Sequence, residues 1–173
     1  LHLLSRRQRQ MCIRDRILEG DVSKTAIVMS WRGKTGGIKG AKRGNEVVMV
    51  PNDYAYFDYY QSKDVDKEPF GIGGFVDVAK VYSLDPTEGL TAEEGKKIIG
   101  VQANLWTEYI TTFSHAQYML LPRMAALAEV AWTPQADREY SNFLNRAKLL
   151  TQRYEALGYN FAKHILQEAK SNE

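Results

Sequence analysis

The sequence has little of several features that would narrow its class. It contains one cysteine, Cys12, among 173 residues, which excludes an internal disulfide bond. No apolar run approaches the roughly 20 residues that a membrane-spanning helix needs, and there is no internal repeat or low-complexity tract. With 44% hydrophobic and 25% charged residues, the composition is typical of one globular domain with a real core.

Residues 1–16 differ from the rest of the chain. Between Arg6 and Arg16 the sequence RRQRQMCIRDR has no apolar periodicity and no helix cap, and it back-translates without interruption to the adapter of transposase-based sequencing libraries. We therefore interpret residues 1–16 as a foreign segment and residues 17–173 as the native part, whose true beginning we expect upstream. A basic arm for nucleic acid or an anionic membrane is the less favoured alternative.

The foreign segment changes what the net charge implies. The whole chain has 23 basic and 21 acidic residues, a net charge of +2. Without the five Arg and one Asp of the adapter-like stretch, 18 basic and 20 acidic residues remain, a net charge of −2. The charge is therefore no argument for nucleic acid. With Cys12 set aside, the cysteine content says nothing about the cellular compartment.

Three apolar runs alternate with helical patterns along the chain. Continuous apolar runs are typical of strands buried on both faces of a parallel sheet, and they cover residues 24–31, 45–51 and 98–106. A long aromatic loop and a short helix over 75–86 separate the second run from the third, and Thr91 to Glu94 form a capping-box signature. The end of the chain predicts a helix over 114–132, with a break or a new first helical residue at Pro122. It also predicts an amphipathic helix over 136–158, with Leu157 on its apolar side and Gly158 as the residue that ends it.

This alternation predicts an α/β protein with a parallel sheet. Three strand–helix units are too few to close a (β/α)₈ TIM barrel, which typically takes about 250 residues. The chain is therefore either a small open sheet or part of an incomplete barrel, and the expected loss of the native start favours the barrel.

Groups suited to a carbohydrate follow each predicted strand. Trp31 ends the first run, and Tyr56 and Asp58 follow the second. Trp106 and Glu108 lie two positions apart at the end of the third, where the alternation of a strand would point both side chains the same way. Aromatic faces pack against the C–H faces of a sugar ring, and carboxylates accept hydrogen bonds from its hydroxyls. Each residue alone is better explained as a core aromatic, a turn cap or a solvated acid. Their repetition at consecutive strand ends, which meet at one rim in an α/β barrel, favours a sugar site.

Four motifs together resemble a known family. VMSWRG, YFDYYQ, GVQANLWTE and LPRMAALAEVAW occur in the order found in the C-terminal half of the catalytic barrel of glycoside hydrolase family 20, the β-N-acetylhexosaminidases. The resemblance implies hydrolysis of terminal, non-reducing β-linked GlcNAc or GalNAc with retention, using the substrate's own acetamido oxygen as nucleophile. It implies no metal or organic cofactor, a glycan as partner, no membrane span, and a periplasmic or extracellular location.

The resemblance also implies roles for the five residues. Tyr56 matches the tyrosine that hydrogen-bonds the acetamido carbonyl, which makes it the candidate catalytic residue. Asp58 matches a partner that contacts sugar hydroxyls, and Trp31 and Trp106 match walls of the sugar pocket. Glu108 matches the acceptor that grips the O4 side of the sugar, which favours an exo-acting enzyme.

The family's catalytic pair is missing from this chain. Its H-x-G-G-D-E motif, with the general acid and the preceding Asp, belongs upstream of Ile17, so the chain alone is expected to be inactive. Arg123 and Glu129 also fall in a family motif, on a predicted helix, and we interpret them as structural. Two alternatives remain: a non-catalytic carbohydrate-binding protein, and a two-carboxylate retaining glycosidase that uses Asp58 and Glu108.

Overall fold

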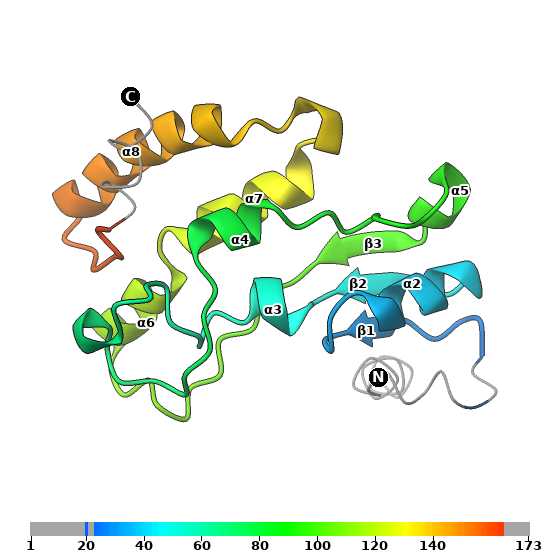
Figure 1. Ribbon diagram of the computed structural model, residues 1–173, viewed down its shortest axis with the longest axis horizontal. Coiled ribbons are helices and arrows are strands. Elements are labelled where there is room, and N and C mark those ends of the chain that lie inside the picture. Colours follow the sequence, from blue (N-terminus) through cyan, green and yellow to red (C-terminus); the bar gives the residue numbers. More distant parts are fainter. Residues whose placement is uncertain (1–19, 21–22, 165–173) are drawn as a thin grey trace, which may run out of the picture. The chain divides into compact units, whose positions relative to one another are not determined.

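The computed structural model describes Gly20 and residues 23–164 (Figure 1). The predicted foreign segment, residues 1–16, lies outside the described residues, so its boundary at residue 17 stays a prediction. The chain divides into two compact units. The first holds the described residues up to Asn52 together with Asp85–Gln102, and the second holds Asp53–Leu84 together with the described residues from Ala103 onward. Each unit is described separately below.

The first unit is built on a parallel sheet. Its strands are β1 (Val28–Ser30), β2 (Val47–Met49) and β3 (Ile98–Val101), in the spatial order β1-β2-β3. Helix α2 (Thr35–Lys42) connects the first two strands, and the short helix α5 (Ala92–Gly95) precedes β3. The predicted parallel α/β arrangement is confirmed, and so is the capping box, because Thr91 and Glu94 form both of its hydrogen bonds.

Two glycines let α2 pack closely on this sheet. A Cβ atom at Gly37 would lie 2.5 Å from the Met49 sulfur, and one at Gly40 would lie 3.3 Å from Val28 and Val47. The core beneath the helix consists of Val28, Ala41, Val47 and Met49. The Gly-rich stretch after the first strand is therefore a packing feature as well as a turn.

The third strand differs from its prediction. It was expected to be buried and to reach residue 106, but β3 ends at Val101, and the Ile99 side chain is 50% exposed. The physical reason is pairing. β3 lies at the edge of the described sheet, and its only neighbour there, β2, already ends at Met49. Without a partner strand, the backbone has no ladder to continue.

The second unit is mainly helical (Figure 1). Its main core consists of buried aromatic and aliphatic side chains, which include Phe57, Val81, Ala126 and Phe143. The elements are α3 (Asn52–Ala55, which begins at the boundary), the 3₁₀ turn η2 (Val65–Lys67), α4 (Val78–Tyr82), α6 (Phe113–Leu120), α7 (Arg123–Trp132), η3 (Gln135–Asp137) and α8 (Tyr140–Ala156).

The C-terminal helices agree with their prediction except in detail. The break at Pro122 is confirmed, because α6 and α7 are separate helices, and Pro122 is the N-cap of α7 rather than its first helical residue. Gly158 has φ +70°, the conformation of a residue that terminates a helix. Leu157 was expected on the apolar side of the last helix, but it is the C-cap just beyond the last residue of α8 and is 64% exposed. In the described part of the chain, no helix combines the length and apolarity that a bilayer crossing demands.

Candidate active site

Tyr56 is held where two distant segments of the second unit pair. It follows α3 and forms an isolated parallel bridge with Asn104. The Asn104 N–H donates to the Ala55 carbonyl (2.8 Å), and the Phe57 N–H donates to the Asn104 carbonyl (2.7 Å). The Tyr56 ring also contacts the Tyr59 ring, with centroids 5.7 Å apart. This pairing brings the segment of Tyr56 and Asp58 beside the segment that leads to Trp106.

Asp58 is a buried carboxylate with unused hydrogen-bonding capacity. Its side chain is 6% exposed, and its Oδ1 has no partner among the described residues. Burial raises the pKa of Asp58, while its own backbone N–H, the backbone N–H of Trp106 and the Arg123 guanidinium lower it, and the Glu108 carboxylate raises it further. The same interactions show that Asp58, Trp106 and Glu108 lie close together. A buried acceptor without a partner is what a sugar hydroxyl can satisfy.

The raised pKa of Asp58 predicts a pH dependence of stability. Because the folded chain holds the Asp58 proton more tightly than the unfolded chain, the stability that protonation contributes is complete below the ordinary pKa of 3.8 and is lost as pH rises through the higher pKa of the folded state. Urea unfolding of the chain and of Asp58→Asn, measured from pH 3.5 to 7.5, should show the unchanged chain losing stability relative to the variant as pH rises. Parallel curves would contradict this assignment.

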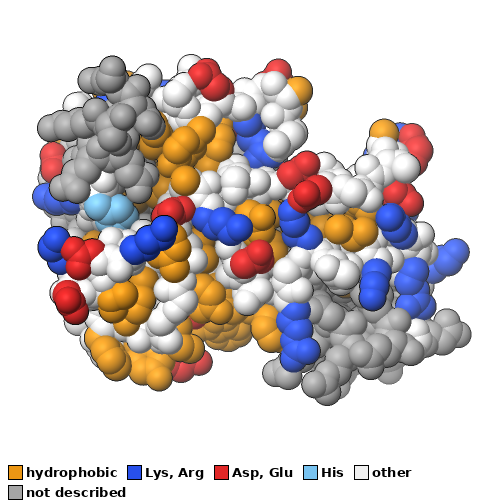
Figure 2. Space-filling view, in the orientation of Figure 1, with side chains coloured by type: hydrophobic (Ala, Val, Ile, Leu, Met, Phe, Trp, Pro, Cys, Tyr) orange, Lys and Arg blue, Asp and Glu red, His pale blue; other side chains and the backbone are white. Residues whose placement is uncertain are grey.

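Trp106 and Glu108 lie on an exposed loop rather than on a strand. Residues 105–108 form neither helix nor strand, and Trp106 is 51% exposed. The expectation that strand alternation would point both side chains the same way is therefore wrong, because neither residue lies on a strand. Both residues nevertheless lie close to Asp58. The loop continues to Tyr109, whose ring packs edge-on against Phe70 at 5.3 Å. This loop and the loop that carries Phe70 run along the lower left of Figure 1, and Figure 2 shows apolar side chains gathered there.

Trp31 belongs to the first unit. It directly follows β1, and the Arg32 guanidinium lies 4.9 Å from the centre of its ring. Ser30 fixes the turn, because its hydroxyl donates to the Gly33 carbonyl (2.9 Å) and accepts from the Gly37 N–H (2.8 Å). The four other predicted residues lie in the second unit. The convergence of Trp31 with them stays a prediction.

The two charged residues of the helix motif have different surroundings. Glu129 accepts a hydrogen bond from the Tyr82 hydroxyl (3.0 Å) and forms an ion pair with Arg146 (2.6 Å). Both contacts agree with a structural role. Arg123 is fully buried and donates to the carbonyls of Phe57 and Tyr59, on either side of Asp58. Sequence reasoning missed this link to the site. The available signal was an arginine in an otherwise apolar stretch, LPRMAALAEVAW.

The arrangement in the second unit can bind and orient a polyhydroxylated ligand. Its paired segments carry a phenol, an indole and two carboxylates, one buried and one exposed, and the carboxylates of Asp58 and Glu108 are close enough to interact. The buried carboxylate of Asp58 has an oxygen without a partner among the described residues, which makes it an acceptor that a ligand hydroxyl can satisfy. In the sequence, no adjacent Asp-Glu pair follows two glycines.

Comparison with known proteins identifies the larger architecture. Residues 1–135 match the family model described as glycosyl hydrolase family 20, catalytic domain. A β-hexosaminidase of Porphyromonas gingivalis is 39% identical over 149 residues, which is 85% of this chain and 19% of that protein. A β-N-acetylhexosaminidase of Cellulomonas fimi is 31% identical over 126 residues, which is 72% of this chain and 25% of that protein. The chain thus spans about a fifth to a quarter of the length of these relatives.

Solved structures agree with the sequence relatives. The exo-β-N-acetylglucosaminidase of Vibrio harveyi, solved in complex with N-acetylglucosamine, superposes with a TM-score of 0.76 at 29% identity and covers 87% of this chain and 24% of that one. A Streptomyces plicatus β-hexosaminidase variant, solved in complex with its product GlcNAc, gives 0.76 at 26% identity, with 86% and 31% covered. The expected α/β barrel class is thereby confirmed. This chain belongs to glycoside hydrolase family 20 and forms part of its barrel-shaped catalytic domain.

Proposed function

We propose that the protein to which this chain belongs is an exo-acting β-N-acetylhexosaminidase. It removes terminal, non-reducing β-linked GlcNAc or GalNAc from a glycan, with retention of configuration. The observation that carries this proposal is the clustering of Tyr56, Asp58, Trp106 and Glu108 in one unit, with a buried Asp58 oxygen left without a partner. The names of the relatives support the same substrate class.

In this reaction the substrate supplies its own nucleophile. The acetamido carbonyl oxygen attacks the anomeric carbon as the bond to the leaving oxygen breaks, and the general acid upstream of this chain protonates that oxygen. Water then opens the cyclic oxazolinium intermediate and restores the β configuration. The Tyr56 hydroxyl donates to the acetamido oxygen and holds it in line for attack, a contribution of positioning that lowers the barrier.

The remaining residues bind the sugar. Asp58 accepts a hydrogen bond from a hydroxyl at its free oxygen, and exposed Glu108 accepts from the O4 side, so the cluster closes around a terminal residue. The half-exposed face of Trp106 packs on the C–H face of the ring. Trp31 forms a further wall of the pocket in this proposal.

The proposal is tested on the complete protein encoded by the extended gene. We expect an adjacent Asp-Glu pair after two glycines upstream, and hydrolysis of both 4-nitrophenyl N-acetyl-β-glucosaminide and the galactosaminide. The matched control is 4-nitrophenyl β-glucoside, which lacks the acetamido group and should not react. Equal turnover of the glucoside would contradict substrate assistance. Sugar binding without turnover of any of the three would support a non-catalytic carbohydrate-binding protein instead.

A further inference from the structure

Arg123 occupies an unfavourable position for a cation. It is the first residue of α7, at the helix end where the backbone dipole already disfavours positive charge. It is 0% exposed, and burial lowers the pKa of its guanidinium to about 9. A buried charge at this position must be offset by specific interactions. The contacts of the Arg123 side chain therefore indicate its role in the structure.

All of its hydrogen bonds go to main-chain carbonyl oxygens. Nη1 donates to Tyr59 and Val76 (both 2.9 Å), Nη2 donates to Phe57 and Met119, and Nε donates to Met119 (3.0 Å). The guanidinium therefore donates five hydrogen bonds to four carbonyl oxygens, of which Met119 accepts two, and its donor capacity is used completely. Its plane also lies 4.8 Å from the centre of the Phe57 ring.

Two of these carbonyls flank Asp58 directly. Phe57 lies between Tyr56 and Asp58, and Tyr59 follows Asp58. Residues 57–59 belong to neither helix nor strand, so their carbonyls lack the partners that regular structure would supply. The guanidinium replaces those partners and ties this turn to the start of α7, 64 to 66 residues away in sequence.

Several charged or titratable groups face the guanidinium from the elements around it. Asp58 lies on the turn itself, Glu68 follows η2, Tyr118 lies on α6 and Asp77 caps α4. Glu68 is itself tied down, because it accepts from the Tyr118 hydroxyl (2.8 Å) and from the Gln61 N–H (3.1 Å). The positive charge of Arg123 thus favours an ionised Asp58 while its hydrogen bonds set the backbone on both sides.

We infer that Arg123 is a positioning residue for the proposed reaction: it fixes the Phe57–Tyr59 backbone and thereby aims the Tyr56 hydroxyl and the Asp58 carboxylate at the sugar. The part of this inference that concerns the reaction rests on the proposed function. The part that concerns the backbone rests only on the hydrogen bonds from Arg123 to the carbonyls. It goes beyond a structural role, because the contacts end on the two peptide units that carry the site residues.

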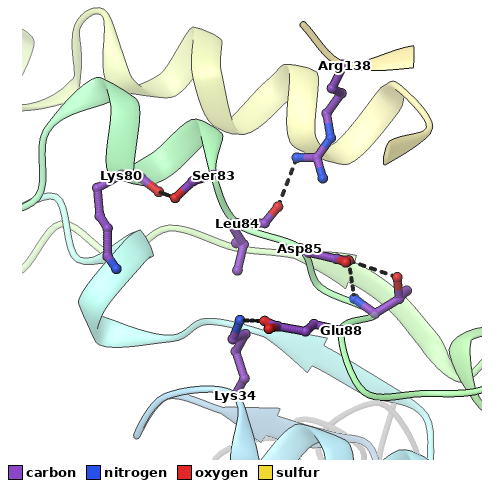
Figure 3. Close-up of polar contacts among 8 residues, drawn as sticks. Lys34, Lys80, Ser83, Leu84, Asp85, Glu88 and Arg138 are labelled. Atoms are coloured by element: carbon purple, nitrogen blue, oxygen red, sulfur yellow. Dashed lines mark hydrogen bonds and ion pairs between the residues drawn. The ribbon is translucent and has the colours of Figure 1, made fainter. Parts of the chain in front are cut away.

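The chain offers a matched control in Arg138. Its Nη1 donates to the carbonyl of Leu84 (2.9 Å; Figure 3). It also donates to the carbonyl of Tyr82 (3.3 Å), so Arg138 too ties a backbone segment of the second unit to a residue distant in sequence. The segment that it holds is the end of α4 and the residues just after it, and this segment carries none of the candidate site residues. Arg138→Met removes the same kind of interaction as Arg123→Met, but at a place that carries no candidate site residue. We therefore expect no effect on catalysis.

The first measurement is amide hydrogen exchange of the 173-residue chain, which needs no activity. We expect exchange in a peptide over residues 56–60 to accelerate by at least about tenfold in Arg123→Met and to stay unchanged in Arg138→Met. The second measurement is hydrolysis of 4-nitrophenyl N-acetyl-β-glucosaminide by the complete protein, normalised to the folded fraction. Arg123→Met should lower kcat/KM by roughly 10²-fold, mainly through kcat, because misplacement of about 1 Å costs that much. Arg138→Met should stay within about threefold.

Arg123→Lys is the second variant, and it tests the positioning role of Arg123 if Arg123→Met does not fold. The lysine keeps the charge and the apolar stem, but its three donors at one nitrogen cannot span carbonyls on both sides of Asp58. We expect a cooperative melt, faster exchange over residues 56–60, and kcat/KM lowered at least about tenfold. Unchanged exchange and unchanged kcat/KM in Arg123→Lys, or equal losses in the Arg123 and Arg138 variants, would overturn the inference. Inactivity of the unchanged complete protein would instead refute the proposed function, and the exchange measurement would still decide the geometry.

Discussion

No release of 4-nitrophenol above background is expected when the purified 173-residue chain is incubated with 4-nitrophenyl N-acetyl-β-glucosaminide. The chain holds the residues that we propose bind and position the sugar, but no H-x-G-G-D-E motif occurs in it. Loss of the general acid alone typically costs about 10²–10⁴-fold. Loss of the Asp that orients the acetamido group adds to this, so the rate should fall below detection.

Two controls make the result interpretable. Circular dichroism and urea unfolding show whether the chain is folded under the assay conditions, and the complete protein serves as the active reference. Turnover by the chain would contradict the prediction. If that turnover disappeared in both Asp58→Asn and Glu108→Gln, the two-carboxylate scheme would apply, in which the carboxyl groups lie about 5–5.5 Å apart across the sugar.

Tyr56→Phe in the complete protein should lower kcat by roughly 10²–10³-fold with a much smaller change in KM. The variant removes the hydroxyl that we propose donates to the acetamido oxygen where charge develops, and the loss of one such donor typically has this size. Steady-state kinetics on the N-acetyl-β-glucosaminide measure both constants. The substitution keeps the aromatic ring and its contact with Tyr59, so the fold should be preserved.

Tyr60→Phe is the matched control for this prediction. Tyr60 lies four residues further along, and its hydroxyl donates to the Gly71 carbonyl and accepts from the Gly71 N–H, both at 3.3 Å. Its loss should affect the loop slightly and kcat by less than about threefold. Equal losses in the two variants would show that the tyrosines only support the loop, and would remove Tyr56 from its proposed catalytic role.

Local sequence signals predicted the secondary structure where a few neighbouring residues suffice. The caps at Thr91 and Gly158 and the break at Pro122 depend on side-chain or backbone chemistry within one helical turn, and all three are confirmed. The end of the third strand was wrong because it depends on a partner. Val101 is the last strand residue since the neighbouring strand stops at Met49.

The site shows the same division. The residue types at 56, 58, 106 and 108 were readable as a carbohydrate pattern, because aromatic rings and carboxylates are the groups that sugars require. Their surroundings were not readable. Strand alternation gave a mistaken reason for pairing Trp106 with Glu108, and nothing in the sequence near Asp58 reveals that Arg123 holds the peptides around it.

By itself, the sequence determined the family, the parallel α/β class, the helix limits that local caps set, and the absence of the general acid from this chain. Only the tertiary structure decided that Asp58 is buried with a free oxygen and that Arg123 serves the turn around it. The physical reason is range: caps and motifs act over a few residues, whereas burial and buried hydrogen bonds join groups separated here by 47 to 66 positions.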